Sequence, residues 1–226
     1  MCEAEIRKHL FLKQVHCPIC EFKFKVNAVK VNSPRILSKD SDFFIRYSSP
    51  NPYFYDIWIC NNCGYTSMKI DFFKIKKHQK QIVLEKIKLL WKPRDYPDII
   101  TASIAVERYK LALVTSVILN SNYSNKAMIS LKIAWMYRLL GDIQNELHFL
   151  KKALKGFNEA YIVESFPMYG LQRDSTMYIL GELNRRLGNN SEALIWYSKA
   201  ITTIGASYKI KDLARNGRDL IKANDN

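Results

Sequence analysis

Four cysteines stand in two Cys-x-x-Cys pairs, and thiols at this spacing are typical of metal binding. Cys17 and Cys20 form the first pair, and Cys60 and Cys63 form the second after 39 intervening residues. One such turn brings two thiolates close enough for one ion, and a second turn beside it completes a tetrahedral shell of four sulfurs. That shell suits Zn²⁺ and leaves no coordination position open to a substrate. We therefore predict one structural zinc ion that organises the N-terminal third of the chain.

Other interpretations of the cysteines stay open. Iron bound as in rubredoxin is one, because a glycine follows the second pair, although Glu21 follows Cys20 in the first. Two disulfides would need an oxidising compartment, and unligated core thiols would need no metal. A fifth cysteine, Cys2, is expected to be a free thiol. His16 is expected to be an ordinary exposed or half-buried histidine rather than an additional ligand.

Residues 1–68 are predicted to fold as a zinc-ribbon-like module that holds both cysteine pairs. A short helix or an extended lead-in is expected over residues 1–16. Strands are predicted where apolar residues alternate with polar ones, or where aromatic and β-branched residues cluster: 22–31, 42–47 and 53–59. A turn is expected at 48–52, which contains two prolines.

Residues 69–97 are predicted to link this module to the rest of the chain through a lysine-rich helix. Apolar residues recur at helical spacing over 69–92, and Pro93 and Pro97 predict its end and the domain boundary. The lysines that could bind a phosphate backbone are Lys74, Lys76, Lys77 and Lys80. A solvated helix face is the alternative interpretation.

Residues 98–226 are predicted to be helical throughout, which makes the fold mainly α with a small β module. Helices are expected at 98–120, with Asp98 as its cap, and at 124–140, 142–160, 175–187, 191–204 and 207–223. Gly141 and Gly188 each follow a helix and predict the left-handed turn of a helical hairpin. Small residues such as Gly181 and Ala193 stand at tetratricopeptide spacing, where they let two helices approach closely. The last helix is expected to cap the array, and an irregular bundle is the alternative.

The first helices of such hairpins line a concave groove. The side chains expected to face it are Trp135 and Arg138 in one hairpin, and Tyr178, Glu182, Arg185 and Arg186 in the other. An aromatic side chain beside arginines suits an acidic or carboxylate-ended protein segment. Arginines that are solvated or paired with Glu182 are the alternative.

The net charge is +14, and it is concentrated toward the N-terminus. Residues 1–97 hold 18 Lys and Arg against 9 Asp and Glu, whereas residues 98–226 hold 17 against 12. A basic surface attracts RNA, DNA or acidic proteins, although biased composition explains the charge equally well. Aromatic residues between the cysteine pairs could stack on bases or cover a small core; they are Phe43, Phe44, Tyr47, Tyr53, Phe54, Tyr55 and Trp58.

No catalytic motif of the HExxH, GxSxG or phosphate-loop type is present in the sequence. Asp40, Asp42 and Asp56 could form a carboxylate cluster, but pairs with lysine or arginine are the simpler expectation. No apolar run of 18 residues occurs, and the first 15 residues lack the apolar segment of a signal peptide. We therefore expect a cytoplasmic protein that is not an enzyme and has no membrane partner.

The order of these motifs closely resembles the DUF2225 family of bacterial proteins, which is uncharacterised. The resemblance runs from about residue 14 to about residue 205 and is carried by HCPIC, KDSDFFIRY, NPYFYDIWICNNCGY, KIAWMYRLLGD and LGELNRRLGN. It implies a cysteine-rich N-terminus joined to tetratricopeptide-like helices, with the four paired cysteines as metal ligands. It implies no reaction and no substrate.

Two hypotheses of function remain. The favoured one is a non-catalytic, cytoplasmic scaffold that binds zinc and accepts an acidic protein segment in its helical groove. The rival is an RNA- or other nucleic-acid-binding module that uses the lysine-rich helix and the aromatics near the cysteines. They differ in salt dependence, which is steep when lysines bind phosphates.

Overall fold

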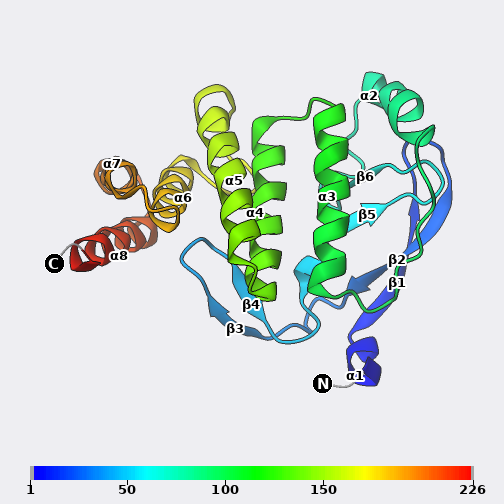
Figure 1. The fold of residues 1–226 in the computed structure, drawn as a ribbon, viewed down its shortest axis with the longest axis horizontal. Coiled ribbons are helices and arrows are strands. Elements are labelled where there is room, and N and C mark those ends of the chain that lie inside the picture. Colours follow the sequence, from blue (N-terminus) through cyan, green and yellow to red (C-terminus); the bar gives the residue numbers. More distant parts are fainter. Residues whose placement is uncertain (1–2, 225–226) are drawn as a thin grey trace. The chain divides into compact units, whose positions relative to one another are not determined.

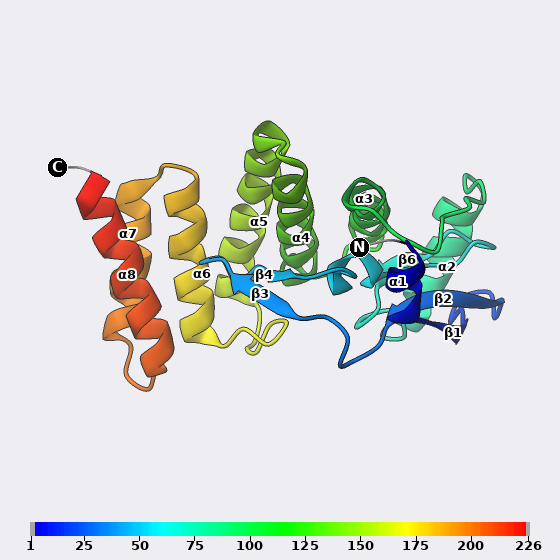
Figure 2. The ribbon, with the colours of Figure 1, turned by 90° about the horizontal axis from the view of Figure 1, so that it is seen from below.

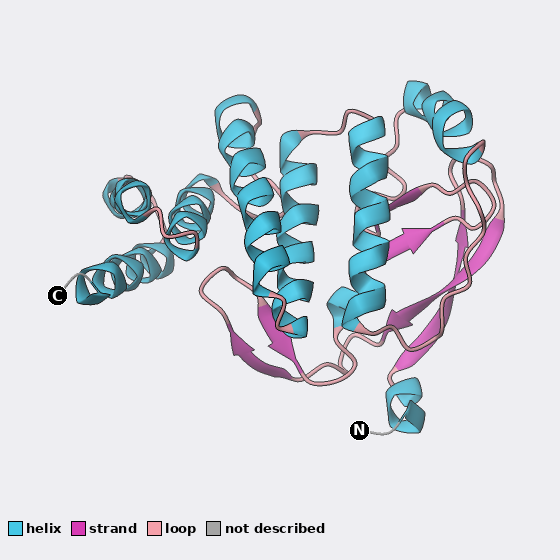
Figure 3. Ribbon diagram, viewed as in Figure 1, coloured by secondary structure: helices cyan, strands magenta, loops and turns pink. Residues whose placement is uncertain are grey.

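A computed structural model describes residues 3–224 and shows a mainly α-helical chain with a small β module (Figures 1 and 3). The chain divides into two compact units, each built from separate stretches of sequence. Within the described residues, unit 1 comprises 3–39, Ile45–Ser121 and Trp135–Ile143, and unit 2 comprises Asp40–Phe44, Asn122–Ala134 and 144–224. This division differs from the boundaries predicted at residues 68 and 97. Cys2 lies outside the described residues.

Antiparallel hairpins of two strands each form the β module of the described chain. The pairs are β1 (Leu10–His16) with β2 (Lys23–Val29), β3 (Ile36–Lys39) with β4 (Ile45–Tyr47), and β5 (Ile57–Ile59) with β6 (Thr66–Met68). The turn between β1 and β2 holds the first cysteine pair, and the turn between β5 and β6 holds the second. The strand predicted at 22–31 is confirmed as β2. The strand predicted at 53–59 is shorter, because Pro52–Tyr55 form a 3₁₀ turn, η1, capped by the Asn51 side chain.

The lysine-rich segment is helical only in its second half. Helix α2 (Lys77–Val83) continues into a π-helical turn, η2 (Leu84–Lys88). The predicted helix over 69–92 is therefore wrong for residues 69–76 and 89–92. Residues 69–73 form turns that place Phe72 fully buried in the core around the cysteines. Before β1, helix α1 (Glu3–Lys8) provides the short helical lead-in.

Helix α3 (Ala102–Ile118) belongs to unit 1, where it packs on η1, β5 and β6. The Tyr109 hydroxyl donates a hydrogen bond of 2.8 Å to the carbonyl of Tyr53. Arg108 donates to the carbonyls of Phe54 and Ile57 at 3.1 and 2.6 Å. These bonds explain why α3 groups with the cysteine module rather than with the later helices.

The start of α3 corrects one expectation. Its N-cap is Thr101, whose side chain accepts the N–H of Ile104, and not Asp98. The Asp98 carboxylate instead accepts hydrogen bonds from Arg7 at 2.6 Å and from Asn27 at 3.0 Å. Asp98 therefore joins α1, β2 and the segment before α3.

Helices α4 (Tyr123–Leu140) and α5 (Ile143–Val163) confirm the first predicted pair of helices. Gly141 lies between them with φ of 72°, the left-handed conformation expected of a helix-ending glycine. Within unit 2, a Cβ at Gly156 would lie 2.9 Å from the Cβ of Ala127. The two helices thus need small residues where they touch.

Helices α6 (Arg173–Arg186), α7 (Asn190–Thr202) and α8 (Tyr208–Asn224) pack against one another in unit 2 (Figures 1 and 2). Gly188 has φ of 79° in the turn between α6 and α7, as predicted. The Tyr197 ring lies between two glycines: a Cβ at Gly181 would lie 2.6 Å from it, and a Cβ at Gly217 would lie 2.5 Å from it. The close approach expected at Gly181 is therefore present, and Tyr197 fills the space.

Within residues 3–224, none of the helices combines the length and the apolar character that crossing a bilayer requires.

Candidate metal centre

The structure brings the four paired cysteines together in unit 1. Their sulfur atoms all lie within 4.8 Å of one another. The Sγ atoms of Cys17 and Cys63 are 3.6 Å apart, and those of Cys20 and Cys60 are 3.5 Å apart. In a tetrahedral centre with metal–sulfur bonds of about 2.3 Å, neighbouring sulfurs are about 3.8 Å apart. All four are free cysteines, and the cluster could hold one metal ion.

The two cysteine turns share one backbone pattern. In each, the residue after the second cysteine donates its N–H to the carbonyl of the first cysteine: Glu21 to Cys17 at 3.0 Å, and Gly64 to Cys60 at 2.8 Å. Both of these residues take a positive φ, 60° for Glu21 and 75° for Gly64. Glu21 thus adopts the conformation that glycine adopts in the second turn, at some cost in backbone strain.

Trp91 covers the second cysteine turn. A Cβ at Gly64 would lie 2.6 Å from Cδ2 of Trp91, so the ring rests directly on the glycine. The Trp91 Nε1–H donates to the carbonyl of Asn61 at 2.9 Å, and the N–H of Arg94 donates to the Asn61 Oδ1 at 2.8 Å. The segment after η2 therefore holds this turn in place. Sequence reasoning missed this role because it assigned residues 91–94 only to the end of a helix.

Aromatic side chains form the core beside the cysteines. The Phe72 ring lies 4.9 Å from that of Tyr65 and 5.5 Å from that of Trp58. The Tyr65 hydroxyl donates to the Phe72 carbonyl at 3.2 Å, and burial raises the pKa of Tyr65. Tyr55 and Phe44 are also buried, outside this core, and Phe44 belongs to unit 2. Buried rings cannot stack on bases, so the core interpretation holds for Trp58, and Tyr55 and Phe44 are likewise closed to bases.

The acidities of the thiols are linked by their contacts. The pKa of Cys60 lies far below its ordinary value because its sulfur accepts hydrogen bonds from Cys17 and Cys63 and from nearby backbone N–H groups. The pKa of Cys17 is raised, chiefly by its contact with Cys60, and that of Cys63 is raised by its contacts with Cys17 and Cys60. One thiolate is favoured and further ones are disfavoured. A divalent cation would offset the additional negative charge.

His16 is exposed and lies outside the sulfur cluster. The three aspartates proposed as a carboxylate cluster are not grouped as possible metal ligands within the described residues. Asp56 pairs with Lys69 at 2.7 Å, and Asp42 lies 3.7 Å from Nε of Arg186. Pairing with basic residues, the simpler expectation, is what the structure shows for these two.

The residues predicted to line a groove are buried or half-buried in the structure. Trp135 is 4% exposed, and its ring lies 5.3 Å from that of Tyr53 within unit 1. Tyr178 and Glu182 are each 1% exposed within unit 2. Arg138 is half-buried in the stretch of α4 that belongs to unit 1. The spacing placed Tyr178 and Glu182 on one helix face, but that face is covered.

Glu182 is the centre of a buried polar cluster on α6. Its carboxylate accepts hydrogen bonds from Arg185 Nη2 at 2.8 Å, Arg186 Nε at 2.8 Å and the Tyr197 hydroxyl at 2.7 Å. The arginines thus pair with Glu182, which was the alternative to their facing a partner. Burial alone would raise the pKa of Glu182, but hydrogen bonds from Arg185, Ser41 and Tyr197 outweigh it and hold this pKa below its ordinary value.

The chain's own residues 40–44, here called the tip segment, cover this cluster from the loop between β3 and β4. The Ser41 hydroxyl donates to Glu182 Oε1 at 2.6 Å and accepts from Arg186 Nη2 at 2.9 Å. The Ser41 carbonyl accepts the Tyr178 hydroxyl at 2.7 Å. The Phe43 ring lies 5.2 Å from the Tyr178 ring. No local pattern in the sequence predicts these contacts, because about 140 residues separate the partners.

The four candidate phosphate-binding lysines lie near the start of α2. Lys74, Lys76 and Lys77 are exposed and Lys80 is half-buried. Lys74 pairs with Asp71 at 3.3 Å. The lysines are therefore available at the surface, although they do not follow one long helix as predicted.

Comparisons with known proteins place the chain in a family without assigning an activity. An uncharacterized protein of Borreliella burgdorferi is 23% identical over 158 residues, which are 59% of this chain and 53% of that protein. The chain thus spans about half the length of this curated relative. No solved structure matches it. The model of the family described as "Uncharacterized protein conserved in bacteria (DUF2225)" matches residues 10–221, and the chain therefore belongs to the DUF2225 family.

Proposed function

We propose that the protein is a non-catalytic scaffold whose N-terminal unit is held together by one structural Zn²⁺. The observation that supports the metal is the cluster of four cysteine sulfurs within 4.8 Å, near the spacing of a tetrahedral shell. Four thiolates would fill that shell, so the ion would have no position left for a substrate. The ion would join the β1–β2 turn to the β5–β6 turn and would offset the thiolate charges.

Metal analysis of the purified protein tests the first part of the proposal. We expect one equivalent of zinc, no visible absorption of iron–thiolate type, and loss of the near-UV circular dichroism of Trp58, Tyr65 and Trp91 after chelation. Cys63→Ser should lose the metal, whereas Cys2→Ser is the matched control and should retain it. Finding one equivalent of iron would overturn the assignment of the metal as zinc but would support the four-sulfur site. An unchanged spectrum after complete metal removal would overturn the structural role.

For the scaffold role, we infer that the α6 face binds an acidic, aromatic segment of a partner protein in place of the tip segment. The tip segment supports this inference because it shows which chemistry the face accepts: a serine hydroxyl at Glu182, an aspartate near Arg186 and a phenyl ring on Tyr178. Phe43 has φ of 69°. A bulky residue in that region carries about 1–3 kcal/mol of backbone strain. Release of this strain would favour replacement of the tip segment by a partner segment.

A fluorescent peptide with the sequence KDSDFFIR, taken from residues 39–46, probes this exchange. We expect weak binding to the native protein and at least tenfold tighter binding to Phe43→Ala, because that change weakens the internal competitor. A peptide with both aspartates replaced by asparagine is the control and should bind less tightly. Equal binding to both proteins would contradict replacement of the tip segment, and no binding to either would overturn the acidic-segment proposal.

Nucleic-acid binding is a second candidate function, favoured by one observation. Lys76 and Lys77 are exposed, and Phe73 close by is 58% exposed, so a phosphate-binding and a base-stacking group lie together. Binding of labelled single-stranded RNA at several salt concentrations tests it. A steep slope of the logarithm of the binding constant against the logarithm of salt concentration, flatter in the double variant Lys76→Gln/Lys77→Gln, would support this function over the scaffold. No binding at low salt would overturn it.

A further inference from the structure

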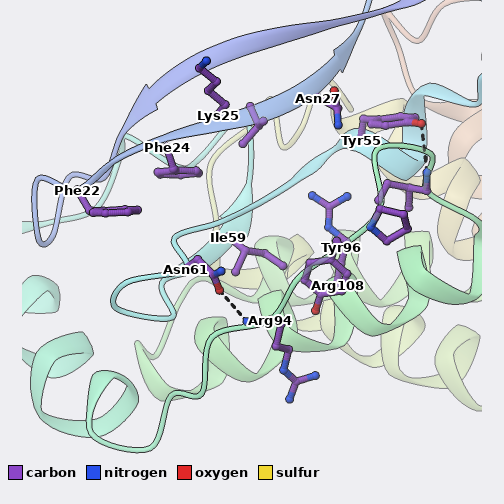
Figure 4. A pocket seen from close by; sticks show the side chains of 13 residues that line it. Phe22, Phe24, Lys25, Asn27, Tyr55, Ile59, Asn61, Arg94, Tyr96 and Arg108 are labelled. Carbon is purple, nitrogen blue, oxygen red and sulfur yellow. Dashed lines mark hydrogen bonds between the residues drawn. The ribbon is translucent and has the colours of Figure 1, made fainter. Parts of the chain in front are cut away.

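Unit 1 contains a pocket of about 330 Å³ that has no connection with the cysteine sulfurs (Figure 4). It lies between side chains of β2, the η1–β5 stretch, the segment before α3, and α3 itself. Its volume is at the small end of the range, roughly 300–1,000 Å³, that is usual for small-molecule sites. We call it the Arg108 pocket, after the charged residue that reaches it from α3.

Arg108 has unused hydrogen-bonding capacity in this pocket. Two of its N–H groups donate to the carbonyls of Phe54 and Ile57, whereas a guanidinium offers five. Its Nε atom is buried and has no hydrogen-bond partner. Among the buried side-chain nitrogens and oxygens of the described chain, it is the one atom without such a partner. Such an atom calls for an explanation, often a bound water or ion.

The charge of Arg108 is also uncompensated by any carboxylate. Within residues 3–224, Arg108 takes part in none of the ion pairs, and the lining of the pocket includes no Asp or Glu. Its guanidinium lies over the Tyr96 ring at 5.6 Å. Burial lowers its pKa, as expected for a cation withdrawn from water. A half-buried cation in such surroundings attracts an anion.

Arg94 is different, although it also lines the pocket. Its guanidinium points away from the other labelled side chains in Figure 4 and pairs with Glu107. Glu107 also accepts the Tyr96 hydroxyl at 3.0 Å. Arg94 is therefore a matched control for Arg108: a second arginine at the same pocket with its charge already paired.

On the side of β2 the lining combines the rings of Phe22 and Phe24 with Val26 and with the polar side chains of Lys25 and Asn27. Phe22 and Phe24 lie there in Figure 4, away from the guanidinium of Arg108. Asn61 also lines the pocket, and its Oδ1 is already used by the Arg94 N–H. Its amide N–H₂ is the part of the side chain that can still donate. One end of the pocket thus suits an oxyanion and the other suits a flat apolar group.

We propose that the Arg108 pocket binds a small organic oxyanion, with its carboxylate or phosphate at the guanidinium of Arg108 and its aromatic or apolar body against Phe22 and Phe24. An oxyanion of this type would accept hydrogen bonds from guanidinium N–H groups that Phe54 and Ile57 do not use and from Asn61, and it would supply the missing negative charge. The proposal does not involve the α6 face, and Asn61 of the second cysteine turn is the residue that it shares with the metal centre.

The Nε–H signals of arginine in ¹H–¹⁵N spectra of the full-length, metal-loaded protein test this directly. The probes are phenyl phosphate, benzoate, inorganic phosphate and phenol at constant ionic strength. We expect the Arg108 signal, assigned by its couplings or by its loss in Arg108→Lys, to shift in a saturable way with phenyl phosphate or benzoate. Inorganic phosphate should bind at least tenfold more weakly, phenol should leave this signal in place, and the Arg94 signal should not move with any probe.

Each alternative outcome is distinguishable. An Arg108 signal that does not move, or that moves equally with added chloride, would overturn the proposal and leave a pocket that holds only water. Equal affinities for inorganic phosphate and phenyl phosphate would overturn the proposed contact of the apolar body with Phe22 and Phe24. Phe22→Ala separates the two halves further, because Phe22 is 45% exposed and its removal should be tolerated. The variant should bind phenyl phosphate at least fivefold more weakly and should bind inorganic phosphate with unchanged affinity. Equal binding of phenyl phosphate to the variant and to the native protein would contradict the aromatic contact.

Discussion

Replacing Glu182 with glutamine should lower the free energy of unfolding of α6–α8 by about 3 kcal/mol. Removing one partner of a buried ion pair typically costs about 3–5 kcal/mol, because the remaining charge is left buried. The two arginines here keep 23% and 21% of their side chains exposed, so they can recover some hydration. Glutamine also retains an acceptor for the Tyr197 hydroxyl. Both effects place the cost at the lower end of the range.

Amide hydrogen exchange of α6–α8 is the suitable assay, because it reports the stability of this part of unit 2 without assuming two-state unfolding. A loss of about 3 kcal/mol corresponds to roughly 150-fold faster exchange of the most protected amides. Glu192→Gln is the matched control, since Glu192 is exposed in the first turn of α7. Its removal should cost less than about 1 kcal/mol.

Acidification should reproduce the effect in the native protein. The pKa of Glu182 is lower in the folded state than its ordinary value of 4.5. The stabilisation is therefore complete above the unfolded pKa and is lost as pH falls through the folded pKa. The difference between native protein and Glu182→Gln should shrink as pH falls below about 4. Exchange rates of the two proteins that agree within about fivefold at pH 7 would refute the reasoning and show that desolvation cancels the pairing.

Three glycine substitutions give further predictions. Gly64→Ala should lower the stability of unit 1 by about 2–4 kcal/mol, because Gly64 has a positive φ and contacts Trp91. Gly141 also has a positive φ but has open space around it. Gly141→Ala should therefore cost only about 1–2 kcal/mol. Equal losses in calorimetry would contradict the Trp91 contact. Gly217→Ala should destabilise by about 1–2 kcal/mol in urea titrations, because overpacking against Tyr197 exceeds the gain in helix propensity of about 1 kcal/mol; a stabilised variant would refute that packing.

Local patterns in the sequence predict much of this fold. The helices around Gly141 and Gly188 were predictable because the apolar period and the left-handed glycine act within a few residues. The sulfur cluster was predictable because two Cys-x-x-Cys turns have few uses besides one shared ion. These signals require no knowledge of distant contacts.

Other parts were not predictable, for physical reasons that can be named. All four residues of β3 are exposed, so no alternation of burial marks it as a strand. Phe72 is drawn out of the predicted helix by the core around the cysteines. The groove prediction placed Glu182 and Tyr178 on one face, but that face is covered by Ser41 and its neighbours, whose contacts depend on tertiary structure alone.

The position of the tip segment has a practical consequence for dividing the chain. Its five residues group with unit 2, while both strands that flank it group with unit 1, so no single cut yields two intact halves. A fragment that starts at residue 98 would keep Glu182 and Arg186 but lose Ser41, leaving the Tyr178 hydroxyl without its carbonyl acceptor. A fragment that ends at residue 97 would leave the carbonyls of Tyr53 and Phe54 without α3. Truncated forms should therefore be less stable than the corresponding parts of the full chain.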